Sequence, residues 1–206
     1  MSIDWYEAEQ EAAYDRFVEE LYLEHKERAI DEFVTDRLKS YYLANPDVAV
    51  PALQMFKEGL DVKKVSATGA VVCFATATEI ATKSALLKPV VFGLVHSEPL
   101  AGLIADLTVQ HMGLDRFRDL LLGILNHYGG FDLANFHIDG HGKTLWEEMH
   151  QVQEARNRIV HRGITPNPAE VELASQVATM IIGTFLATVV DSLGLKLVKG
   201  GSITKK

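Results

Sequence analysis

The stretch from residue 144 to residue 163, TLWEEMHQVQEARNRIVHRG, predicts one helix with clear limits at both ends. Thr144 is followed three residues later by Glu147, which is the spacing of a capping box. In that motif each side chain bonds to the backbone N–H of the other residue. Gly163 is typical of the position just beyond a helix. We therefore predict a helix over 145–162.

Apolar residues recur along this helix at the spacing of a core-facing stripe: Leu145, Met149, Val152 and Ile159. Arg156 falls within the stripe, and its permanent charge must either reach water or find acceptors. Asn157 and His161 share a polar face with His150. Arg156 and His161 are about 140° apart around an ideal helix. They converge only where the helix ends or where a second chain closes over it.

The bulk composition favours one domain, with or without an extension. The chain has 206 residues and is 48% apolar, which is enough for a single core. Its one cysteine, Cys73, excludes a disulfide framework and fits a reducing compartment. The N-terminus, MSIDWYE, is acidic where a signal peptide would be basic. We expect a cytoplasmic protein that does not enter the membrane.

The net charge of −8 comes entirely from the first segment. Residues 1–60 carry 14 acidic and 6 basic side chains, and the remaining residues carry equal numbers. Helical periodicity predicts a long charged helix over 4–43, ended by Asn45-Pro46, and a shorter one over 51–58, closed by Gly59. This acidic extension is interpreted as a solvated arm or an oligomerisation brace. The alternative is an acidic surface that regulates a basic site or recruits a partner.

The apolar run over 70–87 predicts a buried helix that Pro89 bends or ends. Glu79 and Lys83 are its only charged residues. A carboxylate in such a helix needs a partner. That partner is either Lys83, one turn further on, or Arg156 across the core.

Capping residues and glycines predict another helix between this run and the helix over 145–162. It opens at Ser97, is interrupted near Gly113, restarts after Asp115 and ends at Gly129-Gly130. A loop then leads to the capped helix.

The loop over 129–143 contains His137, Asp139 and His141, residue types that can ligate a metal. Their spacing is not a known zinc pattern. We therefore predict no metal site and no cofactor, with the histidines facing solvent or lining a cleft beside the next helix.

The last helix begins at a second capping box, Asn167-Pro168-Ala-Glu170, and extends to about Leu193. It is apolar nearly all round over 177–190, which predicts the central helix of a bundle. From Lys199 the chain is predicted to be a flexible tail.

No segment shows strand periodicity, so the predicted fold class is all-α. We expect a helical bundle of about five helices over 61–198. An acidic helical extension over 1–60 precedes it, and the tail over 199–206 follows it.

Arg156, Asn157 and His161, near the end of a penultimate helix, resemble the R-N-x-x-x-H motif of the HEPN domains. The resemblance covers about residues 65–195. It implies a metal-independent endoribonuclease of the kind found in toxin, antiviral-defence and RNA-processing systems. It also implies a homodimer whose two motifs line one cleft, and possible regulation by an antitoxin or a defence-system partner.

The resemblance also implies a role for each motif residue. His161 would act as general base on a ribose 2′-hydroxyl or as acid on the leaving 5′-oxygen. Arg156 would stabilise the developing charge on the phosphate, and Asn157 would orient the phosphate or the histidine. The products would be a 2′,3′-cyclic phosphate and a 5′-hydroxyl. Weaker candidates for supporting roles are Glu79, Arg158, Arg162 and His150.

Two features leave other functions open. One HEPN branch has a tyrosine two residues after the histidine, and Gly163 stands there in this chain. The chain could instead be a non-catalytic dimeric module that binds nucleotide, RNA or protein. In that case Arg156 would extend from the core edge, and His161 would be a cation favoured by the helix dipole.

Overall fold

The structure, a computed structural model, describes residue 16 and residues 32–95, 100–104, 106, 118–132 and 134–206. The chain forms two compact units, residues 1–37 and 38–206. In the first unit residues 32–37 are helical, and the Arg37 guanidinium lies 5.5 Å from the centre of the Phe33 ring. Most of the predicted helix over 4–43 lies outside the described residues.

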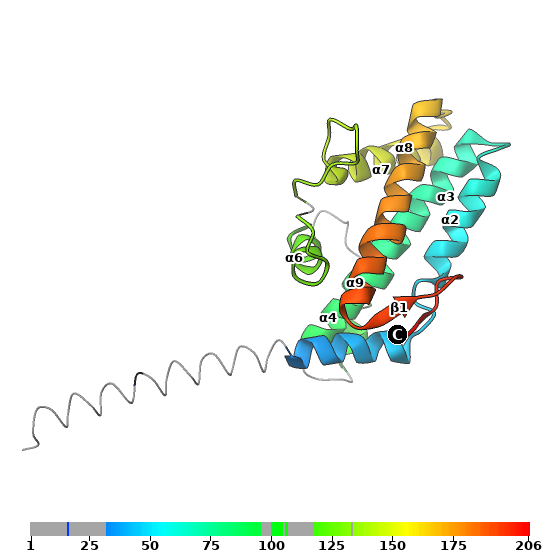
Figure 1. The fold of residues 1–206 in the computed structure, drawn as a ribbon. Helices are drawn as coiled ribbons and strands as arrows, with labels where there is room; N and C mark the ends of the chain where they lie inside the picture. Colours follow the sequence, from blue (N-terminus) through cyan, green and yellow to red (C-terminus); the bar gives the residue numbers. More distant parts are fainter. Residues whose placement is uncertain (1–15, 17–31, 96–99, 105, 107–117, 133) are drawn as a thin grey trace, which may run out of the picture. The chain divides into compact units, whose positions relative to one another are not determined.

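The second unit is an all-α bundle, as predicted, with one small hairpin added (Figure 1). Its elements are α2 (Val50–Val62), α3 (Ala67–Ile80), η1 (Ala81–Leu87), α4 (Lys88–Leu94), α6 (Arg118–Gly129), α7 (Leu145–Arg162), α8 (Pro168–Thr179), η3 (Met180–Leu186), α9 (Ala187–Ser192), β1 (Leu195–Leu197) and β2 (Ile203–Lys205). Here η marks a wider π-helical segment. The segments α3, η1 and α4 form one continuous helix, as do α8, η3 and α9.

The predicted limits of α7 are confirmed, as is the predicted start of α8. The Thr144 and Asn167 side chains accept from the backbone of Glu147 and Glu170, and both capping boxes are complete. Gly163 ends α7 with φ of 64°, in the left-handed conformation that glycine adopts without strain.

The helix predicted to open at Ser97 is described only in part. Residues 100–104 are helical, whereas Ser97, Gly113 and Asp115 lie outside the described residues. The predicted end at Gly129-Gly130 is confirmed by α6.

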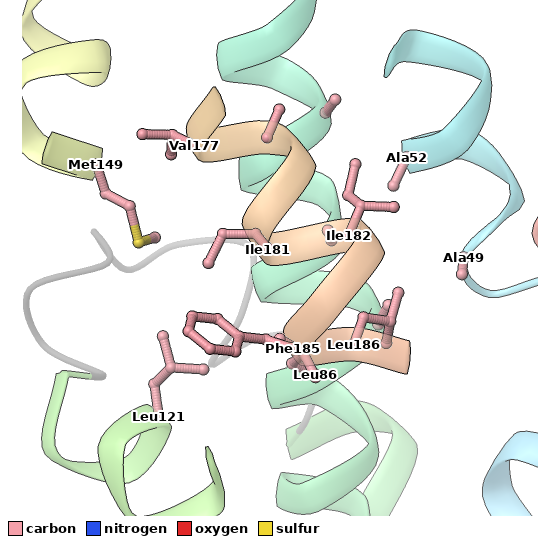
Figure 2. Close-up of a cluster of buried hydrophobic side chains, with 14 of the residues drawn as sticks. Ala49, Ala52, Leu86, Leu121, Met149, Val177, Ile181, Ile182, Phe185 and Leu186 are labelled. Atoms are coloured by element: carbon pink, nitrogen blue, oxygen red, sulfur yellow. The ribbon is translucent and has the colours of Figure 1, made fainter. Parts of the chain in front are cut away.

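The continuous helix of α8, η3 and α9 is the centre of the bundle, as its composition predicts. Along its length it packs against α3, η1, α6 and α7. Figure 2 shows Ile181 and Phe185 pointing toward Met149 and Leu121, on α7 and α6. Ile182 points to the opposite side, where α2 lies. The core is therefore built on both faces of η3.

Gly59 does not end its helix, in contrast to the prediction. Helix α2 continues to Val62, and Gly59 is buried within it. A Cβ atom at Gly59 would lie 2.8 Å from the Phe74 ring, so the glycine allows α2 and α3 to approach closely. Because α2 packs along α3, the bundle begins earlier than the predicted residue 61.

Pro89, which was predicted to bend or end its helix, does not end it, because two adjustments accommodate it. The chain widens into η1, where the Lys88 N–H bonds to the Lys83 carbonyl five residues back. Proline has no N–H to offer the carbonyl of Ala85. The buried Tyr42 hydroxyl donates to that carbonyl at 2.6 Å instead. Burial raises the pKa of Tyr42, so the hydroxyl keeps the proton that it donates.

The predicted flexible tail is instead a β-hairpin, in which β1 and β2 pair antiparallel. The Ile203 N–H donates to the Pro46 carbonyl at 2.7 Å, and the Ser202 hydroxyl donates to Asp47 Oδ1 at 2.6 Å. Ile203 is buried. The hairpin thus covers the chain just before α2.

In the part of the chain that the structure describes, two helices, Ala67–Leu94 and Pro168–Ser192, are long and apolar enough to cross a membrane. Buried residues make up 61% and 56% of their most apolar windows. Core helices of soluble proteins combine the same length and composition.

Candidate functional site

The C-terminal half of α7 positions the predicted motif. The buried residues of α7 are Leu145, Trp146, Glu148, Met149, Val152, Ala155 and Ile159. The core position that the sequence pattern gives to Arg156 is therefore occupied by Ala155, and Arg156 lies at the edge of the core, partly exposed. Its Nη1 donates to the Asn157 side-chain oxygen at 3.2 Å. This contact holds the guanidinium beside the next residue of the motif.

Asn157 and His161 are exposed and lie one turn apart on α7. They line a shallow surface depression together with Glu154, Arg158 and Arg162. Arg156 does not line it within this subunit. His161 makes no hydrogen bond or ion pair with the described part of the chain. The structure thus leaves the imidazole accessible to a ligand.

Arg158 links α7 to the start of α8. Its guanidinium pairs with Glu170 Oε1, and the other oxygen of Glu170 accepts from the Asn167 N–H at 2.9 Å. The pKa of Glu170 is lowered, first by this backbone hydrogen bond and then by Arg158. Arg162 has no ion pair with the described residues. Of these two predicted supporting cations, Arg158 is therefore held in an ion pair within the fold, and Arg162 is available to a ligand.

A second depression lies between α7 and α8, and it adjoins the first. It is lined by Gln151, Val152, Glu154, Ala155, Arg158, Glu170 and Leu173. Glu154 and Arg158 belong to both depressions. The sequence interpretation missed Glu154 and Gln151. The spacing of Glu154, Arg158 and His161 could have identified Glu154, because residues three and four apart share a helix face.

Glu79 pairs with Lys83 at 2.8 Å, and Arg156 bonds to Asn157 instead. Of the two partners predicted for Glu79, the structure therefore shows Lys83, one turn further along the same helix. His150 lies two turns before Asn157 on α7, with its ring 5.4 Å from that of Trp146. Neither Glu79 nor His150 lines the depression that contains His161.

The opposite end of α7 contains a buried carboxylate that the sequence interpretation also missed. Glu148 Oε1 is 2.6 Å from His141 Nδ1, and its Oε2 is buried with no hydrogen-bond partner among the described residues. Its spacing from Leu145 and Val152 placed it in the core-facing stripe. His137 Nδ1 is 2.9 Å from the Lys143 carbonyl. The loop histidines are therefore held by local contacts at the start of α7.

Among the described residues, no group of three or more His, Cys, Asp or Glu is arranged to hold a metal ion. No family model, curated protein or solved structure matches this chain. The chemistry of the site follows from its own residues. An accessible imidazole, an amide and nearby guanidinium groups at a helix end can together bind a phosphate and transfer protons.

Proposed function

We propose that this chain is a metal-independent endoribonuclease of the HEPN type that acts in the cytoplasm as a homodimer. The observation that supports this most directly is the arrangement on the last turns of α7. His161 and Asn157 are exposed one turn apart, and Asn157 accepts a hydrogen bond from Arg156. An RNA phosphate in the depression lined by Asn157 and His161 could therefore meet an imidazole and an amide, with the Arg156 guanidinium hydrogen-bonded to that amide.

In the proposed reaction, His161 removes the proton from a ribose 2′-hydroxyl, and the resulting oxygen attacks the adjacent phosphorus. The P–O5′ bond breaks, which leaves a 2′,3′-cyclic phosphate and a 5′-hydroxyl. Arg156 stabilises the extra negative charge on the phosphate, and Asn157 orients its guanidinium. A protonated His161 of the partner subunit would supply the proton that the 5′-oxygen requires.

Exposed apolar side chains beside the motif support a dimer. Val160 is 51% exposed and Ile164 is 46% exposed, and they flank His161 along the chain. Apolar side chains surrounded by polar ones are typical of surfaces that become the core of an interface. A second copy packed there would bring its own Arg156 and His161 close to the first pair.

The non-catalytic alternative is favoured by one observation. Arg158 is already paired with Glu170, and Arg156 does not line the depression that contains His161. A module of this kind would bind RNA or an antitoxin or defence-system protein through the same surface without cutting RNA. Analysis of the products separates it from the nuclease.

The experiment is cleavage of total RNA and of tRNA by the purified protein in EDTA. The wild type is compared with His161→Ala and Arg156→Ala. His127→Ala is the matched control, because His127 is exposed on α6, outside the motif. We expect the wild type and the control to cut RNA to 2′,3′-cyclic phosphate ends and both motif variants to lose activity. Absence of cleavage by a folded, dimeric wild type would reject the nuclease and favour the binding module.

A further inference from the structure

The depression between α7 and α8 has a floor and a rim of different character. Val152 and Ala155 are each only 3% exposed, and half-buried Leu173 adds to this apolar floor. Gln151 and Glu154 stand at the rim with exposed side chains. The depression encloses about 110 Å³, well below the volume of ~300 Å³ or more typical of pockets for whole small molecules. It therefore has room for a single ring system.

The rim residues have hydrogen-bonding capacity to spare. Neither Gln151 nor Glu154 makes a side-chain hydrogen bond or ion pair with the described residues. Arg158 and Glu170 differ, because they are bonded to each other. A ligand in the depression would therefore meet the Glu154 carboxylate and the Gln151 amide first.

Single-stranded RNA bases are recognised through their hydrogen-bonding edges and through apolar or aromatic surfaces against their rings. A carboxylate can only accept hydrogen bonds. Guanine is the one base whose Watson–Crick edge presents two adjacent donors, N1–H and N2–H, to a single carboxylate. Its neighbouring O6 is an acceptor that the Gln151 amide could bond. The other three bases would place an acceptor against the Glu154 carboxylate.

We infer that this depression binds the base next to the scissile phosphate, and that Glu154 and Gln151 select guanine there. The inference rests on the proposed function, since it assumes that the adjoining depression with Asn157 and His161 holds the phosphate. Glu154 lines both depressions, so a base in one and a phosphate in the other can belong to one nucleotide.

The test separates base selection from cleavage. Short 2′-O-methyl oligonucleotides cannot be cut by 2′-hydroxyl attack, so their binding reports recognition alone. Four fluorescent uridine oligomers with G, A, C or U at the centre are titrated by anisotropy. The proteins are the wild type, Glu154→Gln and Glu172→Gln. Glu172 is a matched control, because it lies exposed on α8, paired with Lys63, and does not line the depression.

We expect the wild type to bind the G oligomer about tenfold more tightly than the other three, as one bidentate contact to a base allows. Glu154→Gln should abolish this preference, because an amide cannot accept from both guanine donors, and Glu172→Gln should retain it. Equal binding of the four oligomers, no binding of any of them, or a preference that survives in Glu154→Gln would overturn the inference.

Cleavage of the unmodified oligomers distinguishes the two proposals. Cutting without a base preference would reject guanine selection and still support the proposed nuclease activity. A guanine preference in binding, without cutting by the wild type, would reject the nuclease activity and still support a guanine-binding site.

Discussion

The two ends of α7 use histidine in opposite ways. At the start, His141 is held 2.6 Å from a carboxylate that is buried in the core. At the end, His161 is exposed and makes no polar contact with the described residues. His141 therefore helps to hold the start of α7 in place, whereas His161, on α7 itself, is left accessible. The comparison shows that a histidine's surroundings, rather than its presence, indicate whether it can do chemistry.

The largest expected effect contrasts these two histidines. His161→Ala should reduce RNA cleavage by about 10²–10⁴-fold, the usual contribution of a general acid or base, and change the free energy of unfolding by less than ~0.5 kcal/mol. His141→Ala should leave cleavage unchanged and destabilise the fold by about 1–2 kcal/mol, since Glu148 is left buried without its partner. Single-turnover cleavage and urea denaturation measure the two quantities. Loss of cleavage in a folded His141→Ala variant would show that the histidine at the start of α7 also contributes to the reaction.

The buried carboxylate gives the next largest effect. Glu148→Ala should lower the free energy of unfolding by about 2 kcal/mol, because it removes a short hydrogen bond and leaves space in the core. Because Glu148 contacts His141 directly, the double variant should be less destabilised than the sum of the single variants, by about 1 kcal/mol. Urea denaturation of the four proteins completes this cycle. Additive effects would show that the pair is not coupled.

The link between α7 and α8 should depend on pH. The folded pKa of Glu170 lies below its usual value of 4.5, so its ionised form stabilises the fold above that pH. This stabilisation is lost as the pH falls through the lower folded pKa. Glu170→Gln should therefore be less stable than the wild type by about 1 kcal/mol at neutral pH, where it weakens the cap. The gap should narrow as the pH falls below 4.5 and through that lower folded pKa. Thermal unfolding over a series of pH values from neutral downward tests this, and a constant gap would argue against it.

The smallest effect concerns the two arginines beside His161. Arg162→Gln should change stability by less than ~0.5 kcal/mol, because its side chain is exposed. It should lower the salt dependence of RNA binding by roughly one phosphate contact. Arg158→Gln should instead lower stability and leave the salt dependence of RNA binding unchanged, since Arg158 is paired with Glu170. Binding titrations at several salt concentrations separate them. An equal salt dependence for both variants would show that neither, or both, contact RNA.

Much of the fold could be predicted from local patterns. The starts of α7 and α8 depend on side chains three residues apart, so the sequence reveals them directly. Gly59 was predicted to end its helix and Pro89 to bend or end its helix, and neither ends it, because their roles depend on distant residues. Gly59 packs against the Phe74 ring. The Tyr42 hydroxyl donates to the Ala85 carbonyl, which Pro89 cannot bond. Such long-range contacts leave no trace in a local window.

The candidate site was predictable in part for the same reason. Asn157 and His161 share a face by their spacing alone, and the structure places both in the same depression. Arg156 lies outside the core stripe because Ala155 occupies the buried position, a rotation too small for periodicity to resolve. The partner of Arg158 could not be predicted, since Glu170 belongs to the next helix.

The C-terminal hairpin has a consequence for protein synthesis. Ser202 bonds to Asp47, 155 residues earlier in the chain, and Ile203 bonds to Pro46. A ribosome that adds 5–20 residues per second leaves these early residues uncovered for about 8–30 s. During translation the segment just before α2 therefore stays accessible to chaperones or to a second nascent chain until the hairpin emerges.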